Sequence, residues 1–280
     1  MRQNTEVITQ WTESAHYWEK YRDTIRGMFA PVTQALIKDA AITAPAVVLD
    51  VAMGPGEPTL SIAQRIGSQG RVVGTDPVPE MVEAARREGN RQGLRNASFE
   101  VAFAESLPFP PDSFDAVVSR FGVMFFASPV DSFREWLRVL KPNGRIAVAV
   151  WHFAEKNPFH YVVAQVVQRY VHSPPPAPDS PDAFRFASPG KLQAVLSAAG
   201  VAATSERLLR FSIQASMSVE KFWTLRSEMS EKLRTKLATL SQEQVAALKG
   251  EVIDALTAYA SDRGVSFPAE VLIVTGRKPS

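Results

Sequence analysis

The chain has 280 residues, contains no cysteine and carries a formal net charge of +2 at pH 7. This length suits one large domain with additions, and the lack of cysteine excludes disulfides, thiolate metal sites and a cysteine nucleophile. Because lysine and arginine form no dense run, neither nucleic acid nor an anionic membrane is expected as a partner. With no apolar leader and no bilayer-long apolar stretch, we expect a soluble, cytoplasmic protein without membrane insertion.

The first segment, residues 7–42, is expected to be helical, because its apolar residues recur at mixed three- and four-residue steps. Such helices commonly pack against the domain that follows them.

The stretch AVVLDVAMGPGE, residues 46–57, organises the rest of the chain. An apolar run without polar alternation is typical of a strand buried on both faces. Gly54 and Gly56 follow it, and glycine lets a chain bend sharply and lets a ligand approach the backbone N–H groups. A helix expected over 57–66 would direct its N-terminal dipole at that ligand. The stretch therefore predicts a ligand loop after the first strand.

The next apolar run, residues 71–75, ends at Asp76, about 20 residues after Gly54. A carboxylate at this distance is placed to accept both hydroxyls of a ribose, which fits any adenosine-containing cofactor. Thr59 stands where a dinucleotide fingerprint has its third small residue, and this disfavours an NAD(P)-dependent oxidoreductase.

From residue 47 to 150 apolar runs and helical segments alternate, which predicts parallel strands joined by right-handed crossovers. The carboxyl ends of such strands meet at one edge, where ligands bind. In this chain those ends are residues 50–56, 76–77, 103–105, 119–121 and 151–152. Beyond them we expect a proline-rich surface loop at 173–181, a strand at 207–214, two or three helices within 218–260 and a last strand at 271–275.

Five blocks in this order resemble one family. They are VLDVAMGPG at 48–56, VGTDPVPEM at 73–81, AESLPF with SFD at 104–115, RFG at 120–122 and RVLKPNGR at 138–145. The chain is similar to class I S-adenosylmethionine-dependent methyltransferases, most of all to the ubiquinone/menaquinone-biosynthesis C-methyltransferases. It departs from them at Ala52, where the family has glycine, at Met53, and at Phe103, where many relatives have an aspartate that contacts adenine.

The resemblance implies an α/β fold, a seven-stranded Rossmann-like doubly wound sheet that is parallel except for its last strand, with helical cap insertions. It divides the chain into a helical lid (1–45), a cofactor-binding α/β core (46–151), the remainder of the core with a proline-rich substrate cap (152–217), a helical cap insertion (218–262) and a final strand with tail (263–280).

The implied cofactor is S-adenosylmethionine, with S-adenosylhomocysteine as the product. Asp76 would bind the ribose, Pro77 and Ala104 the adenine, and Glu105 would replace part of the missing aspartate. Asp50 would either stabilise the loop or hold the methionine end. The remaining residues expected at the cofactor are Ala52, Gly54, Gly56, Ser119 and Arg120 in the core, and Tyr21 and Arg22 in the lid.

A hydroxyl acceptor must lose a proton, and a side chain with a pKa near neutrality takes up that proton best. The candidates are His152 at the rim and His16 and Tyr17 in the lid; an ordinary hydrogen-bonded histidine is the other interpretation of His152. No metal is expected, because the sequence has no cluster with metal-ligand spacing. We predict a methyltransferase acting at oxygen, carbon or nitrogen of a small lipophilic or aromatic acceptor; the alternative is a protein that binds the cofactor without methylating.

Overall fold

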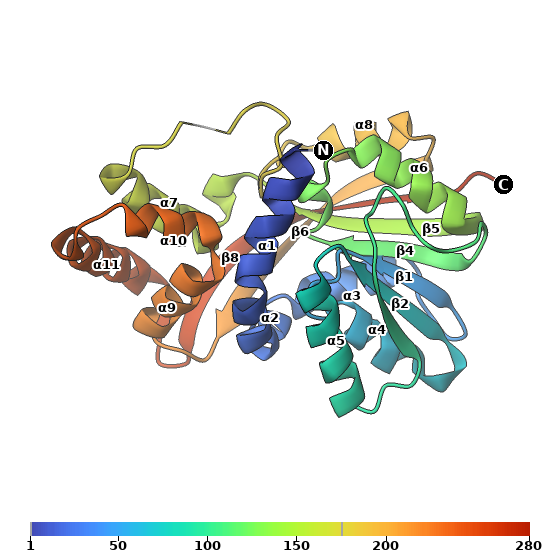
Figure 1. Cartoon of the computed structure of the whole chain (residues 1–280), viewed down its shortest axis with the longest axis horizontal. Helices are drawn as coiled ribbons and strands as arrows, with labels where there is room; N and C mark the ends of the chain where they lie inside the picture. The colour runs from blue at the N-terminus through green and yellow to red at the C-terminus, as the bar shows by residue number, and fades with distance from the viewer. Residues whose placement is uncertain (1, 175) are drawn as a thin grey trace.

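The chain folds around a twisted sheet with helices on both faces (Figure 1). The structure is a computed structural model that describes residues 2–174 and 176–280, with the backbone alone for residues 2–6. Met1, in the expected lid, and Pro175, in the expected proline-rich loop, lie outside the described residues.

In the described residues eight strands form the sheet, in the order β3-β2-β1-β4-β5-β8-β6, with β7 paired to β8. Strands β1 to β5 pair in parallel, and β8 is antiparallel to both β5 and β6. Their bounds are β1 (Val47–Val51), β2 (Arg71–Asp76), β3 (Ala97–Val101), β4 (Phe114–Arg120), β5 (Leu140–Trp151), β6 (Ala202–Ala215), β7 (Ala260–Ser261) and β8 (Gly264–Arg277). The predicted fold class is confirmed, and the two-residue β7 is an addition to it.

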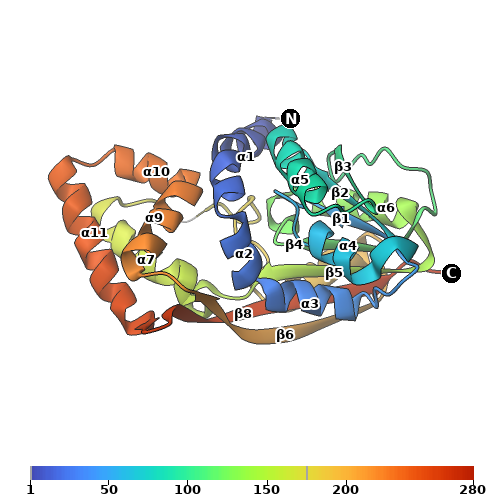
Figure 2. The same ribbon diagram turned by 90° about the horizontal axis from the view of Figure 1, so that it is seen from below.

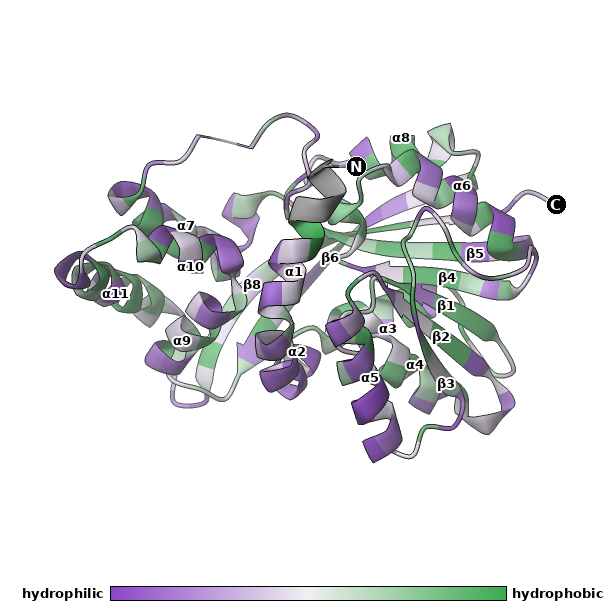
Figure 3. Cartoon of the chain, viewed as in Figure 1, coloured by the Kyte–Doolittle hydropathy of each residue, from purple (hydrophilic) through white to green (hydrophobic). Residues whose placement is uncertain are grey.

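The central strands are apolar because helices cover both of their faces. Figure 3 shows β4 and β5 as largely hydrophobic and the solvent-facing α5 (Pro79–Arg91) as largely hydrophilic. The strand order reverses between β1 and β4, since the chain leads from β1 to β2 and β3 on one side and then returns to β4 on the other. Ligands of such sheets bind outside the carboxyl ends of the strands at this reversal.

Helices α3, α4 and α5 pack on one face of the sheet, and α6 and α8 pack on the other (Figures 1 and 2). The α-helices other than α5 are α1 (Arg2–Lys20), α2 (Arg22–Met28), α3 (Ala30–Asp39), α4 (Thr59–Ile66), α6 (Pro129–Val139), α7 (Pro158–Tyr170), α8 (Lys191–Ala198), α9 (Val219–Met229), α10 (Glu231–Ala238) and α11 (Gln242–Leu256). The short 3₁₀ helices are η1 (Gly67–Gln69), η2 (Val123–Phe125), η3 (Ala154–Lys156) and η4 (Thr257–Tyr259).

Strands β6 and β8 are 14 residues long and pair from Ala202↔Arg277 to Ala215↔Val265, so their far ends project past β5. Helices α7, α9, α10 and α11 gather at this projecting end and are called the helical body below (Figure 1). Helix α1 lies between the helical body and α5, and it contacts α5, α9 and α10. The domain boundaries drawn from the sequence stay a prediction; α9, α10 and α11 fall within the segment 218–262.

Candidate functional site

The loop after β1 exposes its backbone to a cavity of about 370 Å³. Ala52 and Gly54 line this cavity and have φ angles of 60° and 56°. A Cβ atom at Gly54 would meet nothing within 4 Å, whereas a Cβ atom at Gly56 would lie 2.7 Å from Cδ1 of Leu60. Gly54 therefore leaves open space beside the cavity, and Gly56 allows α4 to approach the loop.

Asp50, at the end of β1, holds the start of α4. Its Oδ2 accepts the backbone N–H of Thr59 at 2.9 Å and the Thr59 hydroxyl at 2.6 Å. Burial raises the pKa of Asp50 to about 7, although the bonds from Thr59 act in the opposite direction. Asp50 is buried and is not among the residues that line the cavity, so its contacts fit the loop-stabilising role of the two considered.

Asp76, at the end of β2, links this strand to the loop after β1 and lines the cavity. Its Oδ2 accepts the N–H of Gly54 at 2.9 Å and its Oδ1 accepts the N–H of Val78 at 3.0 Å. Burial raises the pKa of Asp76 to about 6, and the two backbone bonds offset only part of that effect. The carboxylate can still accept further hydrogen bonds, because each oxygen has two lone pairs.

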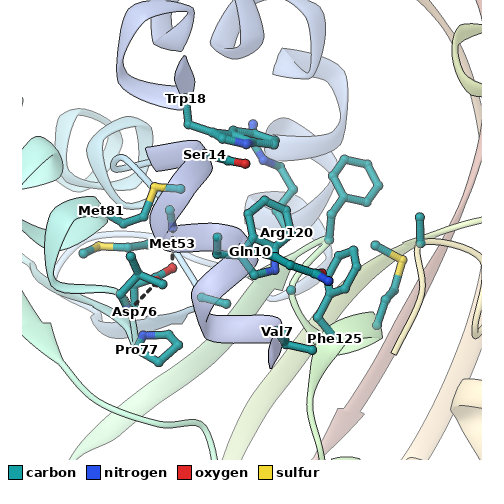
Figure 4. A pocket seen from close by; sticks show the side chains of 18 of the residues that line it. Val7, Gln10, Ser14, Trp18, Met53, Asp76, Pro77, Met81, Arg120 and Phe125 are labelled. Carbon is teal, nitrogen blue, oxygen red and sulfur yellow. Dashed lines mark hydrogen bonds between the residues drawn. The ribbon is translucent and has the colours of Figure 1, made fainter. Parts of the chain in front are cut away.

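Helix α1 covers the cavity with one of its faces (Figure 4). In Figure 4 the labelled α1 side chains run from Trp18 down to Val7, with Asp76 and Pro77 on one side and Arg120 and Phe125 on the other. Residues three or four apart lie on the same side of a helix, which explains why most of these residues line the cavity together. The α1 residues that line it are Val7, Ile8, Gln10, Trp11, Ser14 and Trp18.

Two residues of opposite charge that line the cavity, Glu57 and Arg120, interact electrostatically. Glu57 is 6% exposed; its carboxylate oxygens make no hydrogen bond of ordinary geometry, although Ser61 lies close enough to favour the charged form. Burial raises the pKa of Glu57, while the nearby charge of Arg120 opposes this shift. Arg120 donates to the hydroxyl of Thr33 at 2.9 Å and also lies near Asp50. These charges compensate one another electrostatically inside the protein.

The far end of the cavity is aromatic. The rings of Phe121 and Trp151 stack with centroids 4.5 Å apart, and Phe29 lies edge-on to both at 5.4 and 5.7 Å. Phe121 has a φ of 64°, which is uncommon for a bulky residue. This residue lines the cavity. His160 and Arg226 of the helical body complete this end of the cavity.

Eight of the sequence-predicted cofactor residues line the cavity, whereas four do not. Those that line it are Ala52, Gly54, Asp76, Pro77, Ala104, Glu105, Arg120 and Arg22. Those outside the lining are Asp50, Gly56, Ser119 and Tyr21, and the same holds for the catalytic candidates His152, His16 and Tyr17. Arg22 lines the cavity, but its guanidinium also donates to Glu88 of α5 at 2.7 Å.

The residues outside the lining have other partners. Nδ1 of His152 lies 2.8 Å from Oε2 of Glu270, which agrees with the hydrogen-bonded interpretation of this histidine. The hydroxyl of Tyr21 donates to Glu228 of α9 at 2.7 Å. His16 packs on the ring of Tyr17 with centroids 3.7 Å apart. A catalytic role for these residues stays a prediction.

The sequence reasoning missed Trp11, Trp18, Glu57 and Arg226 as cavity residues. The signal for the tryptophans was the spacing 7-11-14-18, which runs along one side of a helix, next to the stripe of Tyr17 and Tyr21 that was chosen. Local sequence gives no comparable signal for Arg226, because its position depends on how the helical body packs.

Neither a metal cluster nor a membrane span occurs in the part of the chain that the structure describes. There is no group of three or more His, Cys, Asp or Glu side chains that could hold a metal ion. No helix is long and apolar enough to cross a membrane.

Comparison with known proteins gives consistent matches. A model of a methyltransferase domain matches residues 48–144. The demethylmenaquinone methyltransferase of Thermus thermophilus is 34% identical over 183 residues, which are 61% of this chain and 81% of that protein. Aklanonic acid methyltransferase DauC of Streptomyces sp. is 37% identical over 119 residues, 42% of this chain and 54% of that protein.

The chain spans only about half the length, 52% to 58%, of three curated relatives that it matches. Among solved structures, the YcgJ protein of Bacillus subtilis aligns with a TM-score of 0.57 at 24% identity, over 89% of this chain and 98% of that one. This likeness shows a shared fold.

Proposed function

The chain belongs to the class I S-adenosylmethionine-dependent methyltransferases, a family that uses S-adenosylmethionine, and from this premise we propose that it methylates a small lipophilic or aromatic molecule. The observation that carries the proposal is the single cavity that runs from Gly54 and Asp76 at the strand ends to the aromatic residues beneath α1 and the helical body.

The residues present fit an adenosyl cofactor. Asp76 is a buried carboxylate with unused lone pairs beside the cavity, and ribose hydroxyls would supply the donors that its desolvation demands. Gly54 leaves open the space that a side chain would occupy. Phe103 is 43% exposed and lines the same region, where its ring can offer an apolar surface to adenine. Pro77 and Ala104 line the same cavity.

Glu57 and Arg120 suit the amino-acid end of the cofactor. An ammonium group would add charged donors to the Glu57 carboxylate, whose burial Ser61 and Arg120 offset only in part. Arg22 and Arg120 line the same cavity and carry the positive charge that a carboxylate needs. We propose these residues in place of Tyr21, whose hydroxyl is bound to Glu228.

The bound cofactor supplies an electrophilic methyl group on a positively charged sulfur, and the charge is lost when the methyl group is transferred. The protein must therefore align the acceptor and exclude water. Trp11, Trp18 and Phe125 make ring contacts with one another at the mouth, with centroids 5.6 Å apart for the tryptophans and 5.1 Å for Trp11 and Phe125. These rings can close the cavity over a bound acceptor and can also hold a cation.

A small-molecule acceptor is supported by two relatives whose names refer to demethylmenaquinone and to aklanonic acid. The aromatic residues Phe29, Phe121, Trp151 and Phe159 at the far end of the cavity support an apolar or aromatic one. The atom that is methylated stays open among oxygen, carbon and nitrogen.

Two measurements test the proposal. Calorimetric titration of the whole chain should detect binding of S-adenosylhomocysteine, and Asp76→Ala should weaken it by about 1.5–3 kcal/mol, the usual effect of a hydrogen bond to a charged group. The exposed Asp131 provides the matched control, Asp131→Ala, whose affinity should equal that of the wild type. Absence of binding in the wild type would overturn the assignment.

Turnover is tested by incubation with methyl-labelled S-adenosylmethionine and a panel of phenols, quinones, aromatic acids and amines. Transfer of label to a member of the panel is the expected result. Cofactor binding without transfer to any of them would instead support a protein that binds the cofactor without methylating.

A further inference from the structure

Arg226 of α9 carries a positive charge that the described residues do not pair. It lines the far end of the cavity, and it takes part in no ion pair in the described part of the chain. Its Nε is buried without a hydrogen-bond partner, and its Nη2 contacts only Nδ1 of His160, at 3.2 Å. The guanidinium lies 4.6 Å from the ring centre of Phe159, which holds it from one side. Burial lowers its pKa to about 10, so it is charged at neutral pH.

The contrast with Arg120 shows what is missing at Arg226. Arg120 lines the same cavity, and its charge is opposed by the nearby carboxylates of Glu57 and Asp50. Arg226 has no such acid beside it. Arg226 is partly buried, and its Nε is wholly so. A charge withdrawn from water without a partner is costly, and an opposite charge that binds beside it reduces the cost.

His160 orients the guanidinium of Arg226 but does not neutralise its charge. A guanidinium can only donate hydrogen bonds, so Nδ1 of His160 accepts and the proton of the neutral ring lies on Nε2. Burial lowers the pKa of His160 well below its usual value, and the charge of Arg226 lowers it further. The rings of Trp151 and Phe159 pack edge-on against it at 4.7 and 4.9 Å. His160 therefore stays neutral and fixes the guanidinium by its packing.

The remaining charged residues at this end of the cavity have partners. Asp182 accepts from Lys232 at 3.2 Å, and Glu231 accepts from the hydroxyl of Thr235 at 2.7 Å. Arg226 is thus the cation at this end that lacks a counter-charge among the described residues.

From this geometry we propose that Arg226 binds an anionic oxygen of the acceptor, whether that oxygen belongs to a carboxylate or to an acidic enol. Arginine matches such groups through paired N–H donors, and the apolar rings around it exclude competing water. The aromatic part of the acceptor would lie against Phe121 and Trp151, which line the cavity with Arg226. This inference rests on the proposed function, because the bound anion is called an acceptor only if the protein methylates it. Its test measures binding alone.

The experiment is calorimetric titration of the whole chain, in the presence of saturating S-adenosylhomocysteine and again without it. The probes are 2-naphthoate for the carboxylate, 2-hydroxy-1,4-naphthoquinone for the acidic enol, and methyl 2-naphthoate and 1,4-naphthoquinone as neutral matches. We expect at least one anion to bind about ten- to hundredfold more tightly than its neutral match, as a hydrogen bond to a charged group implies. The anion that shows the preference identifies which source of the oxygen is recognised.

Arg226→Gln should abolish the preference for the anion, and Arg226→Lys should keep part of it, because lysine retains the charge without the fork of donors. The matched control is Arg169→Gln on α7, an equal charge change at an exposed residue paired with Glu251. It should leave every affinity within about twofold, as surface substitutions do. All three variants should unfold at about the same temperature as the wild type and should still bind S-adenosylhomocysteine.

Equal binding of anionic and neutral probes by the wild type overturns the inference, and so does a preference for the anion that persists in Arg226→Gln. Loss of S-adenosylhomocysteine binding in the wild type would contradict the proposed function instead, and the two failures are therefore distinguishable.

Discussion

The Cβ atom of Ala52 occupies the space that a side chain at Gly122 would need. A Cβ atom at Gly122 would lie 2.5 Å from it, closer than two carbon atoms can approach. Ala52 follows β1 and Gly122 follows β4, so the two residues meet where the strand order reverses, and both line the cavity. The methyl group of Ala52 is therefore accommodated by a glycine on the neighbouring strand end.

The first prediction is a coupling between these two positions. Gly122→Ala should destabilise the protein by about 1–3 kcal/mol through overpacking. In an Ala52→Gly background the same substitution should cost at least about 1 kcal/mol less, because the opposing methyl group is gone. Ala52→Gly alone should change stability by less than about 1 kcal/mol, since relief of the positive φ is offset by a more flexible unfolded chain. Urea unfolding of the four proteins measures the cycle, and additive costs would show that the two sites are independent.

The second prediction concerns the pH dependence of cofactor binding. Burial raises the pKa of Asp76 to about 6, so below that pH the carboxyl group is mostly protonated and accepts hydrogen bonds less well. The affinity for S-adenosylhomocysteine should therefore be full above pH 7 and should fall, by at most about tenfold per pH unit, as the pH drops through 6. Calorimetry between pH 5 and 8 provides the measurement.

Asp76→Asn isolates the contribution of this residue, because the amide does not titrate. Its affinity should be lower than that of the wild type, and the part of the pH dependence centred on about 6 should be absent. A wild-type affinity that is constant across this range would show that the charge of Asp76 is not used in binding.

The third prediction separates the two interpretations of His152. A general base contributes about 10²–10⁴-fold to a rate, so His152→Gln should lower kcat by that factor if the side chain takes the proton of the acceptor. We expect less than about a tenfold loss, because His152 pairs with Glu270 and is not among the residues that line the cavity. The exposed His172→Gln serves as the control, and a selective loss of two orders of magnitude in His152→Gln would restore the catalytic role.

The parallel core could be predicted from the sequence because each of its signals is local. The apolar run that forms β1, the glycines after it and Asp76 at the end of β2 lie close together in the chain, and their spacing is fixed by strand and crossover geometry. The loop contacts of Asp76 with Gly54 follow from that same neighbourhood.

The cover of the cavity could not be predicted in the same way. Aromatic residues of α1 and of the turn after it could face the cavity, and packing decides which of them do. Trp11 and Trp18 of α1 line the cavity, whereas Tyr21, which follows α1, donates to Glu228 of α9. Arg226 reaches the cavity because β6 and β8 extend past the sheet and carry the helical body with them. These positions follow from contacts between segments far apart in the chain, which no short pattern encodes.

The last prediction concerns the attachment of α2 to α5. Glu88 of α5 is 2% exposed, and its carboxylate accepts from Arg22, Arg91 and Gln92. The bonds from Arg91 are the largest cause that lowers its pKa to about 2, and the charge of Arg22 adds to the effect. Because the pKa in the folded chain lies below the usual value of 4.5, this contribution to stability is fully present above about pH 4.5 and is lost as the pH falls toward 2.

Glu88→Gln removes the charge at neutral pH and should lower the free energy of unfolding by about 2 kcal/mol, the cost of breaking a well-bonded, buried ion pair. It should also loosen α1 and α2, which can be followed by protease cleavage near Arg22 and by the fluorescence of Trp11 and Trp18. Glu83→Gln on the same helix removes an exposed pair with Arg86 and should change stability by less than about 0.5 kcal/mol. If both variants unfold alike and α1 stays protected, then Glu88 does not hold α1 and α2 to α5.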